Sequence, residues 1–497
     1  MIHIISNLTL PDSVVFTPLK YLYGMHNTIF GETLAASGSA NLTHDLSIRQ
    51  TIFAPINKAY SESIGTQEVL DEVRYNFINE PLDITDLKHN DLLTTKYTLN
   101  SLNGNPQKVK FTRKGEKFFL NNQVEILLDP GIPLTYTANA VHAGNTIIYN
   151  LATKLSPPGP LRPTTSEGLS LFRSFHHLVY TGLDQRVIFD ENAITALLPS
   201  DKAWSAMGLA ERYLLSEEAK EDLKKVLLEC VLEGVYYSID FSEESRRIKT
   251  LSGETISLRG VEGDLVFEDK DLKVHMAERD ILAANGVGHS ISAVPLPKSV
   301  VITPENLINA TGFKGWLNIL HEYDLSSYLD INSHHTLLIP TDEAIRSASL
   351  DTLKQEILAS LIDYHIIPPI DGHPPPNLLT ETPSKVTTLS GKSLKIKQIY
   401  PSVWTIQTNS STVAARVLDQ GKTSHGTQIL LIDAVLFEPI ASASGWARAI
   451  AVVIFGVAVV VIIAAGVGFV VRWVQRRKET KPLFADEERE PFLDEES

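Results

Sequence analysis

The sequence predicts an α+β protein of three similar modules in tandem, followed by one transmembrane helix. Apolar, strand-like runs end at Pro55, Pro199 and Pro340, and a short helix-like pattern follows each of them. The prolines lie about 140 residues apart, a spacing that indicates repetition of whole domains and not of a solenoid unit. Near the C-terminus, residues 449–471 carry no charged side chain, and the stretch is long enough to cross a bilayer with some tilt.

The repeated pattern is a buried strand that runs directly into a capped helix. In residues 335–345 the apolar run ends at Pro340, and Thr341 follows at the place where a side-chain oxygen accepts the free N–H groups of a helix. The acidic residues after it suit the positive end of the helix dipole. Residues 194–204 and 50–60 repeat this order, so a strand and a helix are expected in each.

Each module continues with an amphipathic helix, a glycine turn between strands and a closing strand. In the turns, Gly253, Gly391 and, less clearly, Gly104 supply the positive φ that such a turn needs. Apolar residues at helical spacing are expected to face the core. They are Leu223, Val226, Leu227, Cys230 and Val231 in the second module, and Phe313, Trp316, Leu317, Leu320, Leu353, Ile357, Leu361 and Ile362 in the third.

Composition is that of an ordinary globular protein. A chain of 497 residues is long enough for about three domains that each bury a core. The net charge of −15 argues against a nucleic-acid partner. Cys230 is the single cysteine, so an intrachain disulfide is excluded.

No catalytic, cofactor or metal site is predicted. Residues 421–423 read like the end of a phosphate-binding loop, but Arg416 stands where the first glycine of that loop is required. The adjacent histidine pairs at 334–335 and 176–177 lack the spacing with a nearby acid that a zinc site needs.

Internal similarity also suggests the module boundaries. Residues 3–11 match, in register, the strand-like stretch from His289 to Pro297. Because the later stretch closes a module, residues 1–11 are predicted to close a preceding module; a short N-terminal strand is the alternative. Short proline-bearing linkers separate the modules. The predicted parts are modules at 12–158, 159–298 and 299–440, a transmembrane helix at 449–471 and an acidic tail at 472–497.

Charges around the apolar stretch predict its orientation. Arg448 stands alone before it, whereas several basic residues lie between Arg472 and Lys481. The positive-inside rule then places the C-terminus in the cytosol and the modules in a lumen or outside the cell. On that side the Asn-x-Ser/Thr sequons would be usable for N-glycosylation. They begin at Asn7, Asn41, Asn309 and Asn409.

The acidic tail contains a short pattern of its own. Glu488 lies four residues before Phe492, and Leu493 follows. The pattern resembles an acidic dileucine sorting signal with phenylalanine in place of the first leucine. A merely solvated tail is the alternative reading.

Together these motifs resemble the fasciclin (FAS1) domain family. The resemblance rests on the strand–helix pattern, on residues 363–368 at the end of a helix, on the Leu-Ser-Gly turns and on closing residues such as 285–291. Residues 278–289 look like the family's second conserved box. The resemblance covers nearly all of residues 1–440. It is weaker in the first module, whose closing box reads as residues 139–144, and the box at 425–433 lacks the usual asparagine.

The resemblance implies a β-sandwich or wedge with packed helices, no cofactor, and adhesion or scaffold work through protein or glycan partners. It also implies a setting in the matrix, the cell wall or an endomembrane lumen, with the vacuole membrane known for some single-pass fungal members. Two pairs linked to receptor binding in animal members occur as Tyr364–His365 and Asp280–Ile281; the second module has Glu229–Cys230 at the Tyr-His position. Both pairs also fit core packing, so both readings stay open.

The first functional hypothesis is a type I single-pass protein whose repeats bind partners at the vacuole membrane or the cell surface. A second is a tail-anchored protein with cytosolic repeats that acts in membrane contact or fusion. A third, an enzyme on this scaffold, would require a pocket with converging residues of shifted pKa.

Overall fold

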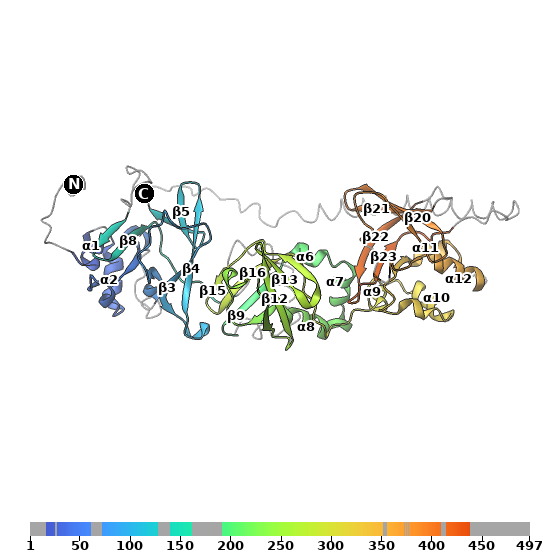
Figure 1. Ribbon diagram of the computed structural model, residues 1–497, viewed down its shortest axis with the longest axis horizontal. Helices are drawn as coiled ribbons and strands as arrows, with labels where there is room; N and C mark the ends of the chain where they lie inside the picture. The colour runs from blue at the N-terminus through green and yellow to red at the C-terminus, as the bar shows by residue number, and fades with distance from the viewer. Residues whose placement is uncertain are drawn as a thin grey trace, which may run out of the picture. The chain divides into compact units, whose positions relative to one another are not determined.

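Figure 1 shows the computed structural model, which describes residues 16–24, 27–60, 72–127, 140–161, 191–350, 355–371, 373, 375, 377–408 and 414–437. The predicted N-terminal strand, the transmembrane helix and the tail lie outside these residues. The chain forms two compact units. The first comprises residues 1–206 and 217–300, and the second comprises residues 207–216 and 301–497. Both units mix helices with sheets, as the predicted α+β class requires.

A pair of parallel, buried strands occurs three times. In each pair the proline that ends the first strand lies opposite an apolar residue of the closing strand: Leu151, Ile291 or Ile432. Parallel strands covered on both faces favour continuous apolar runs. The three strands predicted from the proline pattern are therefore confirmed. The pairs are β1 (Gln50–Pro55) with β8 (Thr146–Leu151), β9 (Ile194–Pro199) with β16 (Gly286–Ile291), and β17 (Thr336–Pro340) with β23 (Gln428–Ile432).

The helix predicted after each proline forms in two of the three copies. Ser200 caps α6 (Asp201–Ser205) by accepting from the Ala203 N–H, and Thr341 caps α11 (Asp342–Ser347) by accepting from the Ala344 N–H. The first copy was predicted wrongly, because a 3₁₀ turn, η3 (Asn57–Ala59), stands there instead. Ile56 occupies the capping position and offers no side-chain acceptor.

Asn57 and Asp342 instead cap the helix of the preceding segment. Asn57 Oδ1 accepts from the Ile29 N–H at 3.0 Å, in the first turn of α2 (Thr28–Ala36). Asp342 Oδ1 accepts from the Gly315 N–H at 2.8 Å, where α10 (Gly315–Glu322) begins. These residues thus join the ends of β1 and β17 to the second helix of their modules.

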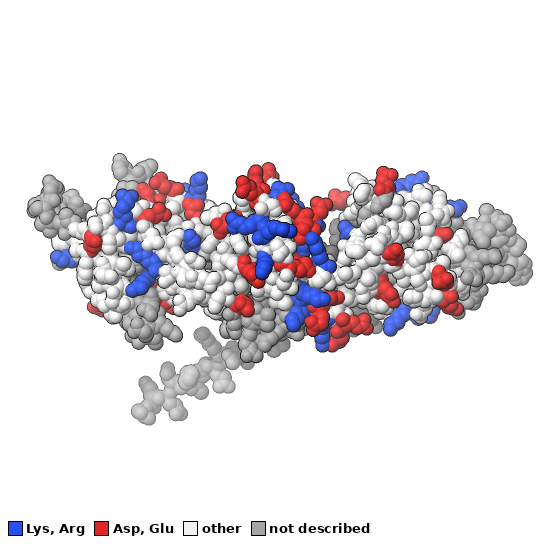
Figure 2. Space-filling view, turned by 60° about the horizontal axis from the view of Figure 1, so that its bottom comes forward, with Lys and Arg blue, Asp and Glu red and all other residues white. Residues whose placement is uncertain are grey.

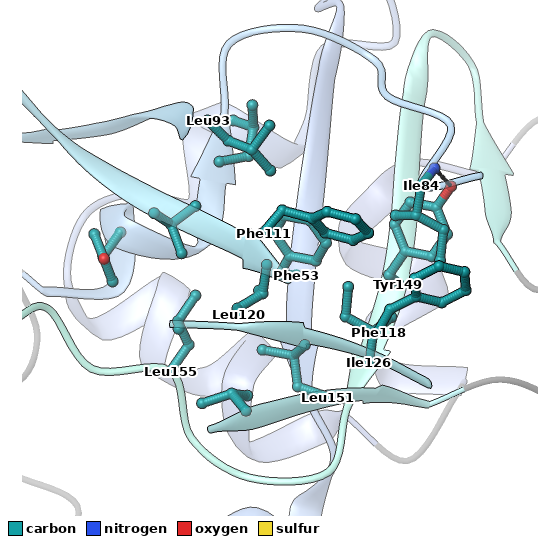
Figure 3. Packing of buried hydrophobic residues seen from close by; sticks show 14 residues of the cluster. Phe53, Ile84, Leu93, Phe111, Phe118, Leu120, Ile126, Tyr149, Leu151 and Leu155 are labelled. Carbon is teal, nitrogen blue, oxygen red and sulfur yellow. Dashed lines mark hydrogen bonds between the residues drawn. The ribbon is translucent and has the colours of Figure 1, made fainter. Parts of the chain in front are cut away.

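In the first module the sheet closes on itself. Its strand order is β1-β2-β3-β4-β5-β6-β8-β7, and β1 also pairs with β8. Aromatic rings fill the interior: Phe111 stacks on Phe118 with centroids 5.6 Å apart, and Phe53 stacks on Tyr149 at 5.9 Å (Figure 3). The other elements are α1 (Pro18–Gly24), η2 (Ala40–Thr43), η4 (Val73–Asn76), β2 (Phe77–Ile78), β3 (Leu92–Thr98), η5 (Asn100–Leu102), β4 (Pro106–Lys114), β5 (Lys117–Leu120), β6 (Val124–Leu127) and β7 (Val141–Ala143).

The first unit also contains two four-stranded sheets, with orders β10-β9-β16-β15 and β11-β12-β13-β14. The predicted apolar face from Leu223 to Val231 is buried throughout, so that prediction is confirmed. The elements not yet given are α8 (Lys220–Glu229), β10 (Val231–Glu233), η9 (Ser238–Asp240), β11 (Arg246–Lys249), β12 (Thr255–Val261), β13 (Asp264–Phe267), η10 (Glu268–Lys270), β14 (Leu272–His275) and β15 (Ile281–Ala283).

The second unit holds a seven-stranded sheet with order β18-β17-β23-β22-β21-β20-β19. The face of α10 that was predicted to be buried is confirmed for Trp316, Leu317 and Leu320. In α12 the predicted burial is confirmed for Ile362 but wrong for Ile357, which is 44% exposed, while the neighbouring Leu358 is buried. Leu353, predicted on the same face, lies outside the described residues. The remaining elements are α7 (Leu209–Leu214), α9 (Pro304–Ala310), η11 (Ser326–Leu329), α12 (Gln355–Tyr364), β18 (Ile366–Ile367), β19 (Ser384–Thr387), β20 (Ser393–Tyr400), β21 (Val403–Thr408) and β22 (Ala414–Lys422).

The three glycine turns lie at the positions predicted from the sequence. Gly104, Gly253 and Gly391 have φ values of 77°, 90° and 76°, in the region that favours glycine. The closing box of the first module, in contrast, was placed too early at residues 139–144. Strand register shows that Asn145, not Asn139, corresponds to Asn285, because Leu151 and Ile291 lie opposite equivalent prolines.

Candidate partner-binding site

The Tyr-His pair of the third module lies at the junction of α12 and β18, inside the protein. Tyr364 is 5% exposed and His365 is 1% exposed. The His365 carbonyl accepts from the Leu338 N–H at 2.8 Å, which ties this junction to β17. The Trp316 ring lies against the imidazole, with centroids 5.0 Å apart. The pair is therefore covered by its own module.

The His365 ring connects two segments through both nitrogens. Nδ1 donates to the Leu361 carbonyl at 2.8 Å, and Nε2 accepts from the Leu436 N–H at 2.9 Å. An acceptor at Nε2 and a donor at Nδ1 require the neutral ring. Burial lowers the pKa of His365 to about 4, in agreement with that state. The histidine thus fixes the end of α12 to the chain after β23.

The same position exists in the other two modules. The Cys230 carbonyl accepts from the Leu197 N–H at 2.7 Å, as His365 does from Leu338. In the first module the pairing of β1 with β2 gives this position to Tyr75 and Asn76, which the sequence pattern had not indicated. Both are buried, and the Asn76 side chain donates to the Phe53 carbonyl at 2.7 Å.

In the second module a buried ion pair replaces the tyrosine. Glu229 is fully buried and pairs with Lys270, whose side chain is 8% exposed. The other carboxylate oxygen accepts from Thr250 Oγ1 at 2.8 Å and Ser252 Oγ at 2.7 Å. Lys270 Nζ also donates to the Leu296 carbonyl at 2.6 Å, which ties down the chain after β16. Every partner lies within the module, so the position supports the fold in all three copies.

The Asp-Ile pair of the second module stands at the start of β15. Asp280 is 3% exposed and has a φ of 54°. Its carboxylate accepts from the backbone N–H of Ser238 at 2.7 Å and also from the Ser238 hydroxyl. Ile281 is half-buried and pairs with Gly288 of β16.

His289, a residue of β16, completes this network. Its Nδ1 accepts from the Asp280 N–H at 3.2 Å, and its Nε2 donates to the Tyr236 carbonyl at 2.8 Å. Burial lowers the pKa of His289, and the nearby Asp280 charge opposes that shift only in part. The neutral imidazole therefore serves as a fixed link between β16 and the loop before η9.

The first module covers the strand that follows Asp280. Lys110 Nζ donates to the Arg279 carbonyl, Gln107 Nε2 to the Ala283 carbonyl at 2.8 Å, and Ser101 Oγ to the Ala284 carbonyl at 2.6 Å. Burial lowers the pKa of Lys110, while the Asp280 charge opposes this change. We call this contact between β4–η5 and β15 the module seam. No local sequence pattern pointed to it, because its partners lie far apart in the chain.

The remaining predicted sites differ in accessibility. Asn41, in η2, and Asn309, in α9, are both exposed. Asn7, Asn409 and the tail residues Glu488, Phe492 and Leu493 lie outside the described residues. On the face shown in Figure 2, basic side chains are interspersed with acidic ones and form no large area of one sign.

Within the part of the chain that the structure describes, His, Cys, Asp and Glu form no group of three or more that could hold a metal ion. A helix with the length and apolar character needed to cross a membrane is likewise absent from the described ranges. The stretch 449–471 lies outside the described residues.

Fold and site geometry together define an α+β protein in which a parallel strand pair and its supporting contacts recur. A model of the fasciclin domain matches residues 170–297 and 311–439, about half of the chain. The chain therefore belongs to the fasciclin family and contains two FAS1 domains. FAS1 domains are typical of adhesion and binding proteins and are generally not catalytic.

Relatives of known sequence include a fungal and an animal protein. The chain is 25% identical over 464 residues to the FAS1 domain-containing protein YLR001C of Saccharomyces cerevisiae, an alignment that covers 87% of this chain and 50% of the yeast protein. It is 23% identical over 205 residues to stabilin-2 of Mus musculus, covering 39% of this chain and 8% of stabilin-2. The chain thus spans about half the length of the yeast relative.

A solved structure of a FAS1 domain pair from the insect cell adhesion molecule fasciclin I is also similar. It shares 14% sequence identity, with 55% of this chain and 98% of that chain covered and a TM-score of 0.24.

Proposed function

We propose that this chain is a single-pass membrane protein whose FAS1 modules bind protein or glycan partners outside the cytosol. In this proposal it works as an adhesion or scaffold protein at the vacuole membrane or the cell surface, by contact and without substrate turnover. The observation that carries the proposal is the order of its parts: two FAS1 domains precede a long uncharged apolar stretch, and a basic cluster follows it.

A third FAS1-like module in residues 12–158 belongs to this proposal. Its support is the parallel pair β1–β8, which repeats the pairs β9–β16 and β17–β23 with the proline at the same end. The buried Tyr75–Asn76 at the position of Glu229–Cys230 adds a second correspondence. Residues 159–298 and 299–440 are the proposed bounds of the other two modules.

Partner contact by Tyr364, His365, Asp280 and Ile281 stays a prediction. The burial of the first three and their bonds within the chain favour a structural role. Partners are therefore more readily accommodated on exposed sheet faces and loops than at these pairs.

Topology provides the direct test. In membranes from cells that express the full chain, glycosidase treatment should increase its mobility on a gel. The variant Asn41→Gln with Asn309→Gln should lose part of that shift, because both side chains are exposed. A protease added from the cytosolic side should leave the modules intact.

Two results would favour the tail-anchored alternative. They are the absence of any glycosidase shift and digestion of the modules by the cytosolic protease. Imaging of a full-length fusion would then separate the vacuole membrane from the cell surface.

A further inference from the structure

The sheet of the third module presents three exposed lysines on one face. Lys385 of β19 lies directly opposite Lys395 of β20, and Lys397 follows two residues later on the same strand. Alternate residues of a strand share a face, and the buried Ile396 between the two β20 lysines faces the core. We call these residues the lysine face. Its members lie about 5 Å apart across strands and about 7 Å apart along β20.

The positive charge of this face is not neutralised within the described chain. No ion pair joins any of the three lysines to an acidic side chain of the described residues. Arg416 of β22, in the same row as Lys397, shows the contrast, because its Nε lies 2.7 Å from the Asp433 carboxylate. Like charges directly opposite each other destabilise a sheet. An anion that binds to the lysine face from outside would offset this repulsion.

The second module provides an internal comparison. Thr250 and Thr388 make the same backbone bond at the glycine turn, so Arg259 corresponds to Lys397. Arg259 pairs with Glu268 at 2.9 Å, whereas the residue equivalent to Glu268 in the third module is the uncharged Gln407. In the same second-module sheet Lys273 pairs with Asp264 at 3.2 Å. At the Arg259 position the third module thus keeps a basic residue, Lys397, and lacks the matching acid.

The side chains beside the lysines are polar. Thr405 lies opposite Lys397, and Gln407 lies opposite Lys395. The exposed apolar residues Ile399 and Tyr400 stand beyond a register shift, at the end of the strand. A surface that inserts into a membrane carries apolar groups among its basic ones, whereas hydroxyl and amide groups suit the hydroxyls of a sugar chain.

We propose that the lysine face binds an acidic polysaccharide chain that carries sulfate, phosphate or carboxylate groups at close intervals. The inference rests on the proposed function, since it specifies the chemistry of one glycan partner. Three ammonium groups on a firm sheet would contact successive anionic groups, and Thr405 and Gln407 would meet the neutral parts of the chain. Because the contact is exposed, its affinity must fall as salt is added.

The test uses the full chain reconstituted in neutral phosphatidylcholine nanodiscs. Binding of a fluorescent heparin oligosaccharide is compared for the native chain and the variant K385Q/K395Q/K397Q. The loss of each lysine charge should weaken heparin binding about fivefold. The triple variant should therefore bind with about a hundredfold lower affinity. The matched control R247Q/R259Q/K273Q removes three charges from the second-module sheet and should change affinity less than about threefold. The charge-conserving variant K385R/K395R/K397R should retain binding.

Three results would overturn the inference. Unchanged heparin affinity in the triple glutamine variant is the first, and an equal loss in the control variant is the second. The third is binding to vesicles of phosphatidylserine and phosphatidylcholine without binding to heparin, which would assign the face to lipid. None of these results bears on the topology test, so this inference and the proposed function fail separately.

Discussion

Glu229 and Lys270 form an ion pair inside the second module, at the position that Tyr75 and Tyr364 occupy in the other two. Two hydroxyl groups and the Leu296 carbonyl satisfy the remaining polar atoms of the pair. Burying two charges is costly, and removing one partner leaves the other without compensation. The pair therefore makes the second module sensitive to the loss of either residue.

We predict that Lys270→Met destabilises the second module by about 3–5 kcal/mol, because it leaves the Glu229 carboxylate buried and unpaired. The matched control is Lys225→Met, which breaks a half-buried pair of 3.5 Å with Asp222 and should cost less than about 1 kcal/mol. Hydrogen exchange of peptides from β9 and β16 measures both changes. Equal protection in the two variants would contradict the assigned role of the buried pair.

The second prediction concerns pH and His365. Its pKa is about 4 in the folded protein and about 6.5 when unfolded, so the unfolded state binds the proton first as the pH falls. The stability that the neutral His365 ring contributes is therefore complete above pH 6.5. It is lost as the pH falls from about 6.5 to 4, and the loss amounts to about 3 kcal/mol. Protection of β17 and β18 amides from hydrogen exchange, corrected for intrinsic rates, should fall across that window.

His365→Asn tests the assignment, because asparagine occupies the equivalent position in the first module. This variant should be less stable at neutral pH. It should also lose the part of the pH dependence of stability that His365 contributes. His321→Asn, at an exposed position of α10, should leave the pH profile unchanged. A profile that persists in His365→Asn would assign the effect to another group.

A third prediction follows from the close approach of β16 to β9. A Cβ atom at Gly286 would lie 2.0 Å from the Ile194 carbonyl oxygen, which belongs to backbone that cannot move alone. Gly286→Ala should therefore destabilise the second module by about 1–3 kcal/mol. At Gly159, where nothing lies within 4 Å of an added Cβ, the same substitution should be neutral. Thermal unfolding of both variants decides the matter, and equal midpoints would exclude the steric argument.

Features set by a few neighbouring residues could be predicted from the sequence. The apolar runs ending at Pro55, Pro199 and Pro340 identified three strands, and the caps at Ser200 and Thr341 were readable because a cap is a local interaction. The helix expected after Pro55 was wrong because that reading gave no weight to Ile56 at the capping position. In α12 the choice between Ile357 and Leu358 could not be made from periodicity, since both are apolar and adjacent.

Features set by strand register could not be predicted. The correspondence of Tyr75–Asn76 with Tyr364–His365 depends on which residues of β2 and β18 face β1 and β17. Family motifs drew attention to Asp280 and His365 as contact residues, but the sequence holds no measure of their burial. The lysine face was missed because Lys385 and Lys395 meet only after β19 and β20 pair.

The last prediction concerns the module seam. Gln107 is fully buried, and its amide donates to Ala283 while its oxygen accepts from the Lys108 N–H. Gln107→Leu would remove both hydrogen bonds from a buried position, at a cost of about 1–3 kcal/mol. Because the seam joins residues of two modules in one compact unit, the loss should speed hydrogen exchange in β4 and β15 together. Gln123→Leu, at an exposed position before β6, should affect neither strand. Faster exchange confined to β4 would show that the seam does not couple the two modules.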